Sequence, residues 1–119
     1  MDIQAPTQEQ LEKELGHALQ ILKDWQCTES EIEQLLGSGY NNRRNCERAD
    51  SDLAERQHNL IKIDEAIRGL FSNPENYLNF VRMENGNPPF EGKTPLEFMM
   101  LHVDGIKTVK EHLMGILAN

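Results

Sequence analysis

The polar segment YNNRRNCER, at residues 40–48, carries side chains whose types and spacing suit DNA. Arg43 and Arg44 can each donate paired hydrogen bonds to guanine, Asn42 can pair with adenine, and Tyr40 can bind a phosphate. The same residues could instead form a solvated polar loop, and composition alone does not separate the two interpretations. One short helix makes few phosphate contacts, so specific binding would need a two-fold dimer that reads two half-sites.

Residue types that act in catalysis do not form a catalytic pattern in this chain. The four histidines include no pair four positions apart, so the helical zinc spacing is absent: His17, His58, His102 and His112. Asp64 and Glu65 are adjacent in a predicted helix and face different directions, which separates them as an acid and base pair. No serine or cysteine lies in a nucleophile motif. We therefore expect no enzymatic activity, no metal and no cofactor.

Length and composition predict one compact cytoplasmic domain. The chain has 119 residues with 38% apolar residues, and no apolar run approaches the roughly 18 residues that a membrane span needs. The net charge of −8 disfavours general nucleic-acid coating and favours a basic partner. Without a signal peptide, Cys27 and Cys46 are expected to be reduced thiols.

The first half of the chain shows the spacing of amphipathic helices. One helix is predicted over 8–26, with these apolar residues on one face: Leu11, Leu15, Ala18, Leu22 and Trp25. Thr28 and Glu31 form a capping box that predicts a second, short helix ending at Gly37. A third, polar helix over 40–47 would hold the recognition position of a helix-turn-helix.

A longer helix is predicted over 52–72. Its apolar face is broad enough to bury against two neighbours at once and includes Leu53, Leu60, Ile63, Ile67 and Leu70. We expect this helix to be the central element of the fold.

The last third of the chain predicts three short helices. Asn73 and Pro74 begin the first, and the capping box Thr94-Pro95-Leu96-Glu97 begins the second. Between them, the prolines and glycines of residues 86–92 predict a shaped loop with Phe90 as its apolar anchor. The residues expected to face the core are Tyr77, Leu78, Val81, Leu96, Met99, Met100, Val103, Ile106, Val109, Leu113, Ile116 and Leu117.

The final residues, LMGILAN, are apolar around much of the predicted helix. Chain ends usually fray and are polar, so an apolar end indicates insertion into another protein or a dimer interface. The simpler interpretation, in which Ile116 and Leu117 complete the core, stays open.

The last third also carries an ordered motif. A glycine precedes Thr-Pro-Leu, and a second glycine precedes a V-x-x-x-L helix: Gly92, Thr94, Pro95, Leu96, Gly105, Val109 and Leu113. With this motif the chain resembles the C-terminal toxin-binding domain of the MbcA/ParS/Xre antitoxin family. A weaker similarity continues upstream, where residues 18–37 look like the entry to that family's degenerate helix-turn-helix.

The resemblance implies an all-α fold, a compact bundle of about six to seven short helices. Residues 1–72 would hold a helix-turn-helix-like region and the long helix, and residues 73–119 a three-helix toxin-binding subdomain, within one compact unit.

The resemblance also implies a partner. Antitoxins of this family commonly bind a RES-domain toxin that degrades NAD, and their C-terminal helix plugs its substrate cleft. The implied function is steric inhibition of such a toxin, together with control of the chain's own operon. The implied toxin-contacting residues are Phe90, Lys93, Thr94, Lys107, His112, Met114, Ile116, Leu117, Ala118 and Asn119.

A second class of function stays open, a stand-alone dimeric transcription regulator whose C-terminal subdomain serves dimerisation. The amount of predicted apolar surface favours a homodimer in either case. A neighbouring gene for a toxic protein would favour the antitoxin interpretation.

Overall fold

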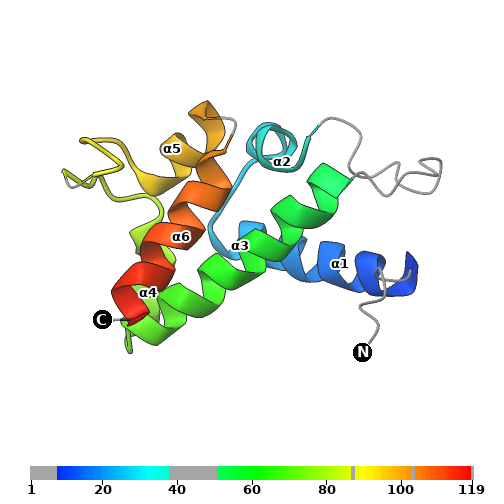
Figure 1. Cartoon of the computed structure of the whole chain (residues 1–119), viewed down its shortest axis with the longest axis horizontal. Coiled ribbons are helices and arrows are strands. Elements are labelled where there is room, and N and C mark those ends of the chain that lie inside the picture. The colour runs from blue at the N-terminus through cyan, green and yellow to red at the C-terminus, as the bar shows by residue number, and fades with distance from the viewer. Residues whose placement is uncertain (1–7, 38–50, 87, 103, 119) are drawn as a thin grey trace.

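The computed structural model describes residues 8–37, 51–86, 88–102 and 104–118, which form helices and loops with no strand among them. The helices are α1 (Gln8–Asp24), α2 (Glu29–Leu36), α3 (Ser51–Leu70), α4 (Pro74–Phe80), α5 (Pro95–Leu101) and α6 (Gly105–Ala118). Figure 1 shows α3 crossing the molecule diagonally, with α1 and α6 packed along it. The predicted all-α fold class is confirmed for this part of the chain.

Helix α1 ends in a Schellman motif. The amide of Cys27 donates to the carbonyl oxygen of Leu22, and the amide of Gln26 donates to that of Lys23, each at 2.9 Å. Gln26 has a φ of 62°, the left-handed conformation that glycine usually supplies at this position. These bonds satisfy carbonyl groups at the end of α1 and turn the chain sharply toward α2.

Helix α2 begins with the capping box predicted at Thr28. Thr28 Oγ1 accepts a hydrogen bond from the Glu31 amide at 3.2 Å, and Glu31 Oε1 accepts one from the Thr28 amide at 2.8 Å. Gly37, with a φ of 101°, follows the helix as expected.

Arg82, immediately after α4, fastens this corner to the C-terminal half. Its Nε donates to the carbonyl oxygen of Trp25 at 2.6 Å, and its Nη2 donates to that of Gln26 at 2.7 Å. Nη2 also lies 3.2 Å from Glu31 Oε1. One guanidinium therefore satisfies two carbonyls that the α1 motif leaves free and the carboxylate that caps α2.

This arrangement shifts two pKa values. The pKa of Glu31 lies below its ordinary value, chiefly because the Thr28 amide donates to the carboxylate; Arg82 adds to the shift and partial desolvation opposes it. Burial raises the pKa of the neighbouring Cys27 thiol to about 11, and the negative charge of Glu31 adds to that rise. Cys27 is a free thiol in the structure, and because Cys46 lies outside the described residues, the expectation of two reduced cysteines stays a prediction.

Helix α3 is the centre of the packing, as its broad apolar face predicts. Leu60, Ile63 and Ile67 are buried, and α3 packs against α1 and α6 along its length and against α2 and α4. A single cluster of buried side chains includes residues of both halves of the chain. None of the described helices has the length and hydropathy needed to cross a membrane.

The starts of α4 and α5 follow their predicted caps. Asn73 Oδ1 accepts a hydrogen bond from the Glu75 amide at 2.9 Å. Thr94 and Glu97 exchange the two bonds of a capping box, each at 3.0 Å. Proline occupies the first turn of both helices, where its missing N–H leaves no hydrogen bond unmade.

The loop before α5 is closed by main-chain hydrogen bonds. Asn85 donates to Lys93 at 3.1 Å, and Gly92, with a φ of 93°, donates back to Asn85 at 2.7 Å. Phe90 is 1% exposed inside this loop. The prediction of a shaped loop anchored by Phe90 is confirmed.

Gly105 allows α6 to begin against α5. A Cβ at this position would lie 2.7 Å from the carbonyl oxygen of Phe98 and 2.8 Å from the Cα of Met99. Both neighbours are backbone atoms, so a side chain fits only if one helix moves.

One part of the predicted core is wrong. Ile116 and Leu117 are 44% and 43% exposed, whereas Val109 and Leu113 of the same apolar stripe are buried. Leu117 lies beside Gly69, where a Cβ would stand 3.6 Å from it. Gly69 offers no side chain to cover Leu117, and α3 itself ends one residue later.

The helix-turn-helix stays a prediction. Its proposed recognition helix, at residues 40–47, lies outside the described residues. The predicted number of helices in the whole chain therefore also stays a prediction.

Candidate protein-interaction site

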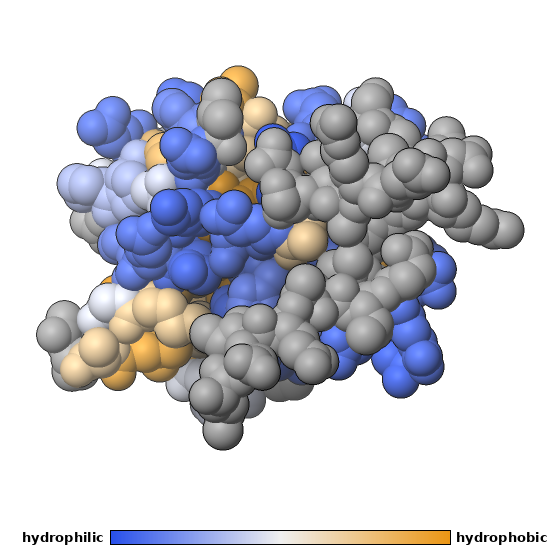
Figure 2. Space-filling model, turned by 45° about the vertical axis from the view of Figure 1, so that its right-hand side comes forward, coloured by the Kyte–Doolittle hydropathy of each residue, from blue (hydrophilic) through white to orange (hydrophobic). Residues whose placement is uncertain are grey.

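The end of α6 presents apolar side chains to solvent. Val109 and Leu113 face α3 and are buried, and the next turn carries the exposed Ile116 and Leu117 together with the half-buried Met114. Figure 2 shows hydrophobic residues at the lower left, the end of the molecule where α6 ends in Figure 1, beside a largely hydrophilic face. The apolar terminus predicted from the sequence is thus a surface feature.

An open groove adjoins this helix end. One hollow of about 450 Å³ is lined by Leu70, Phe71, Phe80, Asn85, His112, Leu113 and Ile116. A second, of about 440 Å³, is lined by Phe71, Asn76, Phe80, Met83, Glu84 and Asn85. The two hollows share three residues, and together we call them the apolar groove.

Aromatic rings form the wall and support of the apolar groove. Phe71 and Phe80 have ring centroids 5.7 Å apart, and Phe80 meets the buried Phe90 edge to face at 6.5 Å. Phe90 also meets His112 edge to face at 5.5 Å, which places the imidazole at the groove. Such edge-to-face contacts fix ring orientation. The buried Phe90 therefore fixes the orientation of Phe80 and His112 in the groove wall without a partner being bound.

The predicted toxin-contacting residues do not all lie on one surface. Phe90 is buried and can shape the surface without touching a partner, and Thr94 is half-buried and committed to its capping box. Exposed or half-buried residues on α6 near the groove are His112, Met114, Ile116, Leu117 and Ala118. Asn119 lies outside the described residues.

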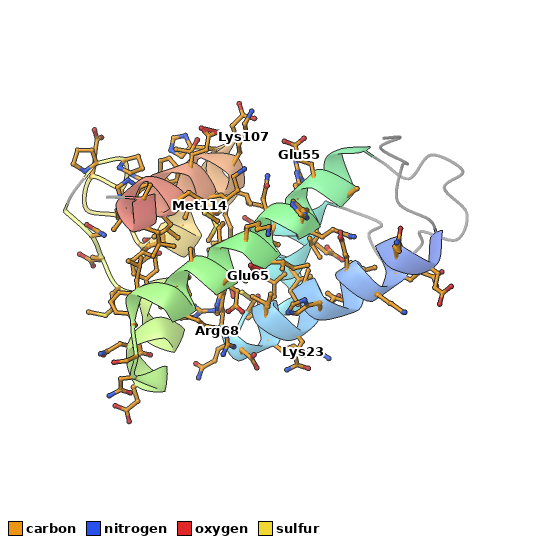
Figure 3. The ribbon with its side chains drawn as sticks, turned by 60° about the horizontal axis from the view of Figure 1, so that its bottom comes forward. Lys23, Glu55, Glu65, Arg68, Lys107 and Met114 are labelled. Atoms are coloured by element: carbon orange, nitrogen blue, oxygen red, sulfur yellow. The ribbon has the colours of Figure 1, made fainter. Side chains whose placement is uncertain are left out.

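The two predicted lysines, Lys93 and Lys107, lie away from the residues at the end of α6. Lys107 is exposed in the first turn of α6, and Figure 3 shows it nearer the start of the helix than Met114. Lys107 and Ile116 are nine positions apart, about 13 Å along the helix axis. Lys93 is exposed in the loop before α5 and lines neither hollow of the groove.

The predicted DNA-binding residues Tyr40, Asn42, Arg43 and Arg44 lie outside the described residues. Their role stays a prediction.

Sequence reasoning did not find most of the groove. Met83 is 61% exposed just beyond α4. Phe80 and Asn85 belong to segments that contact parts of the chain far from them in sequence. The nearest signal in the sequence was the broad apolar face of the helix predicted over 52–72, which was expected to bury against two neighbours at once.

The described residues do not offer a metal site. No group of three or more histidine, cysteine, aspartate or glutamate side chains among them could hold a metal ion. The chemistry available at the apolar groove is burial of apolar surface, with the imidazole of His112 at its edge.

Comparison with known proteins does not identify the chain: no protein-family model matches it, and a search of curated proteins finds no match.

Proposed function

We propose that this chain is the antitoxin of a type II toxin–antitoxin pair and that it sterically inhibits a RES-type toxin that degrades NAD. The observation that carries the proposal is the exposed apolar end of α6, with Ile116 and Leu117 beside the apolar groove. A free surface of this kind lowers solubility and is expected where a partner covers it.

The motif behind the family resemblance also supports the proposal. Its residues hold positions with specific structural demands: Gly92 has a positive φ, Thr94 caps α5, and Gly105 stands against backbone atoms of α5. Leu96, Val109 and Leu113 are buried. These residues maintain the shape of the last third, so contact with a toxin would fall to the exposed residues around them.

Inhibition in this proposal needs no chemistry from the antitoxin. A cleft that accepts the pyrophosphate of a dinucleotide is locally positive, and the net charge of −8 would attract this chain toward it. The apolar end of α6 would then be buried against the toxin, away from water, and would block substrate entry. Met114, flexible and polarisable, can adapt to an irregular partner surface.

Control of the operon through residues 40–44 is a second part of the proposal. It requires a homodimer, because two half-sites must be read together. The dimer would have to leave the apolar groove free for the toxin.

Truncation of α6 tests the proposal. The chain is expressed in cells together with the toxin encoded by the adjacent reading frame, either whole or without the residues from Gly115 onward. The truncation removes Ile116 and Leu117 and keeps the buried Val109 and Leu113, so the fold should survive. We expect the truncated chain to release toxicity.

Circular dichroism must first show that the truncated chain stays helical. A folded truncation that still neutralises the toxin completely would reject the end of α6 as the inhibitory element.

A further inference from the structure

We propose that the apolar groove receives a segment of the partner protein that combines large apolar side chains with lysine or arginine. The inference rests on the proposed function, in which this end of the molecule binds a protein. It adds that the chain accepts side chains of its partner as well as presenting its own.

The apolar half of the inference follows from the lining. Leu70, Phe71, Phe80, Leu113 and Ile116 line the larger hollow, whose volume is about 450 Å³. An apolar cavity of about 150 Å³ can hold a benzene ring, so each hollow can accept at least one ring or branched aliphatic group. Burial of such a side chain removes apolar surface from water and so favours binding.

The expectation of lysine or arginine in the partner segment follows from the helix ends. Helices α3, α4 and α6 all end at the apolar groove, since Leu70, Phe80 and Ile116 line it and lie in their last turns. Carbonyl groups at a helix C-terminus lack partners within the helix and carry negative partial charge. Figure 1 shows the ends of α3 and α6 side by side.

The basic side chain just after α4, Arg82, does not line the groove; its guanidinium donates to the carbonyl oxygens of Trp25 and Gln26 and to Glu31. The last turns of α4 and α6 contain no basic residue. Arg68, in the last turn of α3, binds Asp64 at 2.8 Å. Glu84 is the charged residue of the groove lining and adds negative charge, and no lysine or arginine occurs among the lining residues. A partner segment with lysine or arginine beside its apolar side chains matches this field.

A second copy of this chain is a poorer occupant. Two copies with a net charge of −8 repel each other, and neither copy would offer a lysine or arginine from its groove lining to the groove of the other. A purely apolar or acidic segment would leave the three helix ends without a cationic partner.

Selection from a peptide library tests the inference with the full-length chain. Random peptides of about 16 residues, long enough for four helical turns, are selected on the immobilised protein. Binders are then compared on the unmutated chain, on Ile116→Asp and on Met83→Asp. Both sites are exposed in the free protein, so the variants should fold, which circular dichroism verifies. Leu101→Asp is the matched control, because Leu101 is 65% exposed and lines a different pocket.

We expect the enriched peptides to carry large apolar residues and net positive charge. Their affinity should fall at least about tenfold in Ile116→Asp, stay unchanged in Leu101→Asp, and weaken several-fold in 0.5 M salt, where screening is strong. Groove-dependent binders without positive charge would overturn the cationic half of the inference. The whole inference would be overturned by any of three results: binders whose affinity is unchanged in both groove variants, self-association of the chain through the groove, or no binders at all.

The outcome is separable from that of the proposed function. If the chain selects basic, apolar peptides through the groove but neutralises no toxin, this inference is supported and the antitoxin assignment is rejected. If the chain neutralises a toxin through Ile116 but selects no such peptides, only this inference is rejected.

Discussion

Arg82 and Trp25, 57 positions apart in sequence, are joined by a hydrogen bond of 2.6 Å from the guanidinium Nε to the main-chain carbonyl oxygen. Trp25 lies at the end of α1 and is 1% exposed, and Arg82 follows α4 directly. The bond therefore fixes the corner between α1 and α2 against the segment that leads into the apolar groove.

Loss of the guanidinium should destabilise the whole fold. We expect Arg82→Met to lower the free energy of unfolding by about 2 kcal/mol, because hydrogen bonds to a charged group contribute roughly 1.5–3 kcal/mol. Urea unfolding measures the change. Lys13→Met is the matched control, since Lys13 pairs with Glu9 in full exposure and should change stability by less than about 0.5 kcal/mol. Equal effects of the two substitutions would contradict the role of Arg82.

The depressed pKa of Glu31 predicts a pH dependence of stability. Because the folded-state pKa lies below the ordinary value of 4.5, the carboxylate stabilises the fold above pH 4.5, and this contribution is lost as pH falls through the folded-state pKa. We expect Glu31→Gln to be less stable than the unmutated chain at pH 7, with the difference shrinking below pH 4.5. A difference in unfolding free energy that stays constant or grows in acid would count against this cause.

Gly105 should tolerate no side chain. Gly105→Ala brings a Cβ to within 3 Å of backbone atoms of α5, and we expect a loss of about 1–3 kcal/mol from such overpacking. Gly16→Ala is the control within another helix, because a Cβ there meets nothing within 4 Å and should stabilise α1 by roughly 0.5–1 kcal/mol. Thermal melts of both variants separate the two outcomes. A neutral Gly105→Ala would show that α5 and α6 can move apart freely.

Replacement of Arg43 and Arg44 tests the DNA-binding prediction. The double alanine variant should lose binding to the promoter upstream of its operon, because it lacks the two guanidinium groups proposed to contact DNA. Any residual binding should depend less on salt, by about one unit of slope for each lost phosphate contact. Helical content should stay unchanged. If the unmutated chain, alone or with its toxin, fails to retard that promoter in a gel, operon control is rejected and the antitoxin role is untouched.

Local signals predicted most of the helix boundaries. The capping boxes at Thr28 and Thr94 and the Asn73-Pro74 start each act within three residues, so they can be found in sequence and the structure has all of them. The end of α1 was placed two residues late, because its left-handed residue is Gln26 where a glycine would have marked the stop.

Long-range relationships could not be predicted. Periodicity places Ile116 and Leu117 on the apolar stripe of α6 but does not reveal that α3 ends beside them. The apolar groove depends on three helix ends that meet in space, and the Arg82 contacts cross more than fifty positions. The apolar character of the terminus could be recognised in the sequence, and its neighbouring groove could not.

The affinity of the chain for its toxin tests the central claim most directly. Isothermal titration compares the unmutated chain with Ile116→Asp/Leu117→Asp and with Leu101→Asp, all shown to be folded by circular dichroism. We expect the double variant to bind about a hundredfold more weakly, roughly 2.8 kcal/mol, as when interface residues of high contribution are lost. Leu101→Asp, at a residue that is also exposed but lines a different pocket, should bind like the unmutated chain. Unchanged affinity of the double variant, or an equal loss in Leu101→Asp, would contradict the assignment of the α6 end as the toxin-binding surface.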